Sequence, residues 1–168
     1  GYARLRGCLR DLKHSEFLMQ FSSKEDIEAP IAEVFELLSE FESFERSALR
    51  RGVEVQRVDA SMPKGAGLAW DTVFMVRGKP REMHLELVEY TPPTMMRFES
   101  HSKGVEGKVI IELLALSSRR TRLSFDVSLS ANTLAARLLL QSLKLARANL
   151  SQRFRLKLAE FARDIEER

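Results

Sequence analysis

A chain of 168 residues with 44% apolar and 30% charged side chains has room for one domain with a sizeable core, and this composition excludes a disordered or fibrous protein. Its net charge is only +3, and aromatic residues do not alternate with the basic ones, so nucleic acid is not an expected partner. Because Glu112 and Arg137 interrupt the longest apolar runs, we expect no stable membrane insertion.

Residues 1–18 carry four basic residues but no apolar core of the length that a secretory signal needs. We interpret them as a leader, vector-derived or disordered, in front of a single domain over residues 19–168. The single cysteine, Cys8, cannot form an intramolecular disulfide, and no Cys/His spacing is typical of a metal site. A cytoplasmic location is therefore expected, with no metal and no cofactor.

The first predicted elements are an edge strand and two short helices. Apolar and polar residues alternate weakly over residues 21–28, and Ala29-Pro30 then ends the strand. Proline suits the first turn of a helix, and apolar residues follow at spacings of three and four: Ile31, Val34, Phe35, Leu38 and Phe41. Phe41, Phe44 and Leu49 then indicate a second, shorter helix.

After Gly52 the apolar residues recur with the period of two that is typical of strands. Turns rich in glycine, proline or serine separate six predicted strands, over residues 53–59, 70–77, 82–87, 95–101, 108–116 and 122–129. Because short turns join consecutive strands, the six are expected to form an antiparallel meander. Together with the strand over residues 21–28, the predicted sheet has seven strands.

Residues 133–166 contain neither glycine nor proline, and Asn132 or Thr133 can cap a helix that begins there. One stripe of apolar residues runs along it: Leu139, Leu143, Ala146, Leu150, Phe154, Leu158, Phe161 and Ile165. The run predicts a single helix of roughly 50 Å, whereas strands of nine residues span about 30 Å, so its end is expected to overhang the sheet.

The predicted fold class is α+β, with a seven-stranded curved antiparallel sheet wrapped around the long C-terminal helix and two short helices between strands one and two. A curved sheet contacts a straight helix near the strand ends and stands away from it in the middle. We therefore expect an apolar pocket between the sheet and the helix.

This order of elements resembles the START-like superfamily with its helix-grip fold, which includes polyketide cyclases and dehydratases, lipid-transfer domains and the birch-pollen allergen group. The resemblance covers residues 21–165. It rests on Ala29-Pro30 before Val34-Phe35 and Leu37-Leu38, on Gly67 ahead of Trp70, on Pro93 before Met96-Arg97-Phe98, and on Thr121-Arg122-Leu123. Two features depart from it: Glu42-Ser43-Phe44-Glu45 replaces a tryptophan and proline often found after the first helix, and the allergen group's glycine-rich turn is absent.

Candidate ligand-binding residues are the apolar side chains expected to converge on the hollow: Trp70, Phe74, Met83, Leu85, Met96, Phe98, Leu139 and Leu143. Methionine adapts to an irregular ligand and aromatic rings offer flat contact area. Ordinary core packing is the alternative for each of them.

Polar residues within the strands could instead supply chemistry. His84 lies on one strand face with Glu82 and Glu86, which could hold a metal or form an acid/base couple, although that face is expected to be exposed. Glu112 would have a raised pKa if it pointed inward, but we expect it to point out. Asp71, Arg97, Glu99, His101 and Tyr90 are the other candidates, and no catalytic residue is assigned.

Three functions remain open. The first is binding or transport of a hydrophobic small molecule such as a lipid, a quinone or a polyketide. The second, implied by the resemblance alone, is a cyclase, aromatase or dehydratase. The third is a protein-interaction module that uses the basic end of the last helix, with Arg147, Arg153, Arg155, Lys157 and Arg163. The sequence leaves the ligand, the oligomeric state and the question of catalysis undecided.

Overall fold

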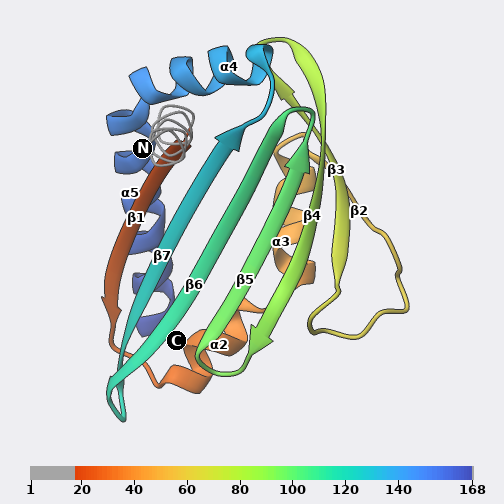
Figure 1. The fold of residues 1–168 in the computed structure, drawn as a ribbon. Helices are drawn as coiled ribbons and strands as arrows, with labels where there is room; N and C mark the ends of the chain where they lie inside the picture. The colour runs from red at the N-terminus through yellow and green to blue at the C-terminus, as the bar shows by residue number, and fades with distance from the viewer. Residues whose placement is uncertain (1–17, 168) are drawn as a thin grey trace, which may run out of the picture.

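The structure is a computed structural model that describes residues 18–167 (Figure 1). Residues 1–17 of the predicted leader lie outside the described residues. In chain order the elements are β1 Leu18–Ile27, α2 Ile31–Leu38, α3 Phe41–Arg50, β2 Glu54–Arg57, β3 Ala69–Val76, β4 Lys79–Thr91, β5 Met95–Ser102, β6 Val105–Ser117, β7 Arg120–Ala131, α4 Leu134–Leu145 and α5 Arg147–Glu166. Across residues 18–167, no helix has the length and apolar character needed to cross a membrane.

The strands form one seven-stranded antiparallel sheet in the order β1-β7-β6-β5-β4-β3-β2. The meander of six consecutive strands is confirmed, and β1 adds to it by pairing with β7 from Leu18 opposite Ser130 to Ile27 opposite Thr121. This pairing places β1 and β2 at opposite edges of the sheet, with the two helices α2 and α3 crossing between them (Figure 1).

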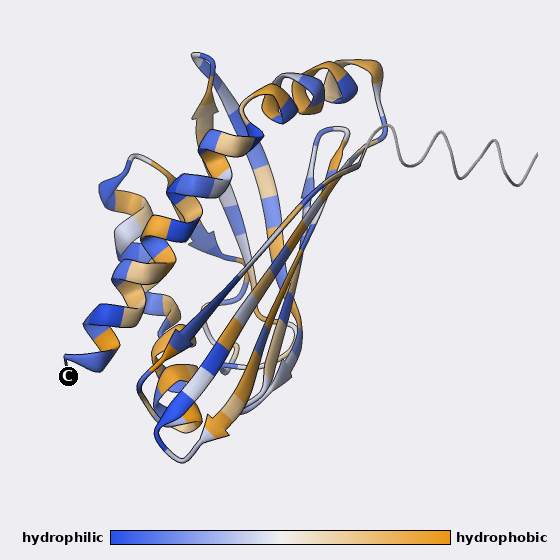
Figure 2. Ribbon diagram, turned by 90° about the vertical axis from the view of Figure 1, so that its left-hand side faces the viewer, coloured by the Kyte–Doolittle hydropathy of each residue, from blue (hydrophilic) through white to orange (hydrophobic). Residues whose placement is uncertain are grey.

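One face of the curved sheet carries the core. Buried residues of six strands meet buried residues of α2, α3 and α5 in one apolar cluster, which includes Ile27, Trp70, Leu87, Met96, Ile111 and Leu123 from the sheet. These helices lie on the same side of the sheet (Figure 2), and polar residues such as Asp71, His84 and Ser124 belong to the other face. The predicted fold class is therefore confirmed, with α5 as the long C-terminal helix.

The structure corrects the extent of that helix. The predicted single rod over residues 133–166 divides at Ala146, where φ is −94° and ψ is 5°. Thr133 caps the start of α4, and its hydroxyl oxygen accepts a hydrogen bond from the Ala136 amide (3.2 Å). It lies across one end of the sheet while α5 runs beside the hollow (Figures 1 and 2).

The two helices pack in different places, which explains the division. In α4, Ala136 and Leu140 form a small cluster with Ala131 at the end of β7, apart from the main core. In α5, Leu158, Ala162 and Ile165 belong to the main core. One straight rod could not reach both clusters, because the sheet ends where α4 begins.

The C-terminal end of α5 does not overhang the sheet as predicted. Ile165 is buried, and the Glu166 carboxylate accepts a hydrogen bond from the Glu28 amide (3.0 Å). The final turn is therefore tied to the chain that follows β1.

Polar contacts at the end of β1 fix where α2 begins. The Thr121 hydroxyl donates to the Ala29 carbonyl (2.8 Å) across 92 positions of sequence, and Thr121 is fully buried. Next to it the Arg122 guanidinium donates to Asp26 (2.8 Å), and this hydrogen bond lowers the pKa of the Asp26 carboxyl. Both contacts join β7 to the end of β1, just before α2 begins.

Replacing Thr121 by valine keeps the side-chain shape but leaves the buried Ala29 carbonyl without its donor. We expect the free energy of unfolding to fall by about 1–3 kcal/mol, measured by chemical denaturation. Thr94→Val is the control, because the Thr94 hydroxyl donates to Thr91 in an exposed turn. Equal losses in the two variants would contradict a special role for Thr121.

Candidate functional site

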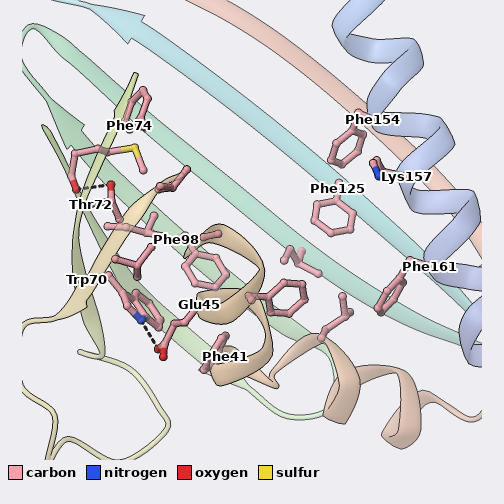
Figure 3. Close-up of a pocket in the computed structure, with 18 of the residues that line it drawn as sticks. Phe41, Glu45, Trp70, Thr72, Phe74, Phe98, Phe125, Phe154, Lys157 and Phe161 are labelled. Atoms are coloured by element: carbon pink, nitrogen blue, oxygen red, sulfur yellow. Dashed lines mark hydrogen bonds between the residues drawn. The ribbon is translucent and has the colours of Figure 1, made fainter. Parts of the chain in front are cut away.

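A cavity of about 870 Å³ lies between the concave face of the sheet, α3 and α5 (Figure 3). Every helix or strand around it contributes mostly apolar side chains. Those that line it are Leu38, Phe41, Phe44, Glu45, Ala48, Val53, Val55, Trp70, Thr72, Phe74, Met75, Met83, Leu85, Phe98, Ile111, Phe125, Phe154, Lys157, Leu158 and Phe161.

The strand register assembles the floor of the cavity. In β3 and β4, Trp70 pairs with Leu85 and Thr72 pairs with Met83, so these four side chains lie side by side on the concave face. Alternation along β5 adds Phe98 to the same face. The floor therefore follows directly from the period-two pattern of the sequence.

Aromatic side chains form two walls at opposite sides of the cavity (Figure 3). On one side the ring of Phe41 in α3 stands edge-on to Trp70, with centroids 5.4 Å apart, and edge-on to Phe98 at 6.2 Å. On the other side Phe125 of β7 meets Phe154 of α5 at 5.2 Å. Edge-to-face pairs of this kind are favourable, so each wall is held by its own contacts.

Glu45 is the acidic residue of the mostly apolar lining, and its carboxylate already accepts hydrogen bonds from other side chains. Its Oε1 accepts hydrogen bonds from Trp70 Nε1 (2.8 Å) and from Arg57 Nε (2.6 Å). The hydrogen bond to Glu45 raises the pKa of the Arg57 guanidinium, which also reaches Glu42 at 3.2 Å. The arrangement orients the indole ring of Trp70 within the cavity.

The other two polar residues of the lining also have partners. The Thr72 hydroxyl donates to the Met83 carbonyl (2.9 Å). Lys157 lies 3.7 Å from Glu160 on the exposed side of α5. A ligand inside the cavity would therefore contact mainly carbon atoms, with the Lys157 ammonium as the cationic group of the lining.

Five of the predicted ligand-binding residues line the cavity: Trp70, Phe74, Met83, Leu85 and Phe98. Three do not. Met96 is fully buried in the closed core, so its side chain is packed by protein. Leu139 and Leu143 belong to α4, which the division at Ala146 carries away from the hollow.

The polar candidates of the strands are not brought together in the cavity. His84 Nδ1 lies 2.9 Å from Asp71, Arg97 reaches Glu89 at 2.6 Å and Glu99 at 3.4 Å, and His101 Nδ1 lies 2.6 Å from Glu106. Glu112 is exposed, as expected, while its neighbours Ile111 and Leu113 point inward. Among residues 18–167 no group of three or more His, Cys, Asp or Glu side chains could hold a metal ion.

Part of the cavity lining was not predicted from the sequence. Phe154 and Phe161 lie on the predicted apolar stripe of the last helix, but the predicted ligand positions, Leu139 and Leu143, come several turns too early. Phe125 shares its inward face with Leu123, and this alternation was a usable signal. Nothing in the sequence indicated that Glu45 would bond to a tryptophan 25 positions away.

Glu45→Leu removes the oxygen that accepts hydrogen bonds from Arg57 and Trp70. We expect the free energy of unfolding to fall by about 1–3 kcal/mol and the fluorescence emission of Trp70, the single tryptophan, to shift. Glu42→Leu is the matched control, because Glu42 also contacts Arg57 but is largely exposed and lies outside the cavity. An unchanged Trp70 emission in Glu45→Leu would show that the carboxylate does not orient the indole.

Solved structures with this architecture are numerous, and the three described next are at most 17% identical to this chain. The Zhui aromatase/cyclase from Streptomyces sp. R1128 is 14% identical with a TM-score of 0.64, over 90% of this chain and 95% of that one. The protein TTHA0849 from Thermus thermophilus is 17% identical with a TM-score of 0.60, over 88% and 97%. Norcoclaurine synthase from Thalictrum flavum is 11% identical with a TM-score of 0.60, over 89% and 85%.

At these identities the structural matches establish the fold alone, and it is the predicted helix-grip fold. No curated protein matches the sequence. A family model does match it, over residues 19–166 and hence nearly the whole domain. The chain belongs to the polyketide cyclase/dehydrase and lipid transport family.

Proposed function

We propose that this protein binds or transports a hydrophobic small molecule, such as a lipid, a quinone or a polyketide-like compound, in the cavity between the sheet and α5. The observation that carries the proposal is an apolar cavity of about 870 Å³ whose inner polar groups, Glu45 and Thr72, are already bonded to protein. Sites for small organic ligands usually measure roughly 300–1,000 Å³ and are lined mainly by apolar and aromatic groups.

The lining favours a ligand with flat or extended apolar parts. Trp70 and Phe98 on one side and Phe125 and Phe154 on the other offer ring surfaces and edges to a guest that spans the hollow. Met75 and Met83 supply flexible side chains that can adapt to an irregular outline. Transfer of such a ligand from water is favourable by about 25 cal/mol for each Å² of apolar surface removed.

Catalysis is the second candidate, because the family includes cyclases and dehydrases. An acid/base reaction needs polar groups aimed at the substrate. The residues predicted for that role, such as His84 and Glu112, lie outside the lining, and Glu45 is engaged by Arg57 and Trp70. The geometry therefore supports binding better than it supports a reaction.

Trp70 makes a direct test possible, since its fluorescence reports on the cavity without interference from another tryptophan. We expect the naphthalene probe 1-anilinonaphthalene-8-sulfonate to bind with saturation and to quench Trp70 by energy transfer. Ala48→Phe adds a ring to the α3 wall of the cavity and should weaken binding about tenfold or more, a difference of roughly 1.4 kcal/mol.

The matched control is Ala32→Phe, the same substitution at an exposed position of α2 outside the cavity, which should bind the probe as the unaltered chain does. Denaturant unfolding of both variants checks that the fold is retained. Equal probe affinity in Ala48→Phe and Ala32→Phe would contradict binding in this cavity.

A further inference from the structure

Helix α4 presents an apolar ridge that no described part of the chain covers. Leu134, Leu138 and Leu145 are 73%, 60% and 91% exposed. They recur at spacings of four and seven, so they share one side of the helix. The opposite side, with Ala136 and Leu140, is buried against the end of the sheet. We define the leucine ridge as Leu134, Leu138 and Leu145.

Basic residues lie near both ends of α4 and beside its middle. Lys103 precedes Gly104, which packs against Thr133 and Ala136 at the start of α4. Arg77, at the tip of the β3–β4 hairpin, donates to the Ser142 hydroxyl in the middle of α4. Arg147 follows the end of the helix as the first residue of α5. All three side chains belong to exposed residues.

Acidic residues are missing from the same part of the sequence. Residues 127–159 contain six Lys or Arg and no Asp or Glu. A second copy of the chain docked on the ridge would bring two such basic segments together. By sequence, residues 1–17 also carry a net positive charge, +2.

We propose that the leucine ridge of α4 docks on an anionic membrane surface, with the leucines at the acyl boundary and Lys103, Arg77 and Arg147 at the lipid headgroups. An amphipathic helix with leucine on one side and bordering basic residues is typical of binding in the membrane interface. Leucine is under-represented among the side chains that dominate protein–protein interfaces, which favours lipid over a protein partner. The ridge also lies close to the cavity. The contact between Arg77 and Ser142 places α4 beside the β3–β4 hairpin, and Met75 of that hairpin belongs to the cavity lining.

The test is co-sedimentation of the full chain with vesicles of phosphatidylcholine containing about a quarter phosphatidylglycerol, compared with vesicles of phosphatidylcholine alone. We expect binding to the anionic vesicles only, and weaker binding as salt is added. The double variant Leu134→Gln, Leu138→Gln should lose about tenfold or more of this binding. Because a phospholipid is also a candidate ligand of the cavity, Ala48→Phe is tested on the same vesicles; sedimentation equal to that of the unaltered chain separates docking on the ridge from binding in the cavity.

Leu114→Gln is the matched control. Leu114 is 60% exposed, like Leu138, but lies on β6 near the hairpin at the opposite end of the sheet from α4 (Figure 1). It should sediment with anionic vesicles as the unaltered chain does.

Two results would overturn the proposal. One is a full chain that stays in the supernatant with anionic vesicles. The other is a homodimer in sedimentation velocity that the leucine substitutions dissociate, since the ridge would then be an interface between copies.

Discussion

Straight helices cannot follow a strongly curved sheet along its whole length, and the main features of this protein arise from that constraint. The sheet has one apolar face that must be kept from water. α2 closes one end of it with Val34, Phe35 and Leu38, and the last turns of α5 close the same region with Leu158, Ala162 and Ile165. Between α3 and the middle of α5 the concave face remains uncovered, and the cavity occupies this space.

The walls of the cavity are held by contacts that leave the interior free. Aromatic rings pair with one another at each side, and the Glu45 carboxylate is fixed between Arg57 and Trp70. Buried polar groups are costly unless they are bonded, so these contacts also remove the need for a ligand to satisfy them. The result is a largely preformed apolar site, which lowers the cost of ordering side chains when a guest binds.

Local pattern predicted much of the fold and part of the site. Alternation predicted that Trp70, Met83 and Phe98 lie on the concave face, because successive side chains of a strand point to opposite faces of the sheet. The division at Ala146 could not be read in the same way, since no glycine or proline marks it and both halves have good helix formers. It depends on where the sheet ends, which is a property of the assembled fold.

Two consequences of that division could not be predicted from the sequence. The lining of α5 is centred on Phe154 and Phe161, while the predicted Leu139 belongs to a separate helix. The ridge of Leu134 and Leu138 becomes exposed only because α4 turns its other side to the end of β7.

The role of Glu45 could not be predicted from its sequence neighbours either, because its hydrogen-bond partners come from β2 and β3.

Native mass spectrometry of the gently purified full chain shows whether the uncovered part of the concave face is a ligand site. We expect a noncovalent adduct in the size range of a lipid, a quinone or a polyketide, which disappears on denaturation and is absent from Ala48→Phe. An adduct that Ala48→Phe retains, or a chain that stays free of adducts even after incubation with a lipid extract, would contradict it.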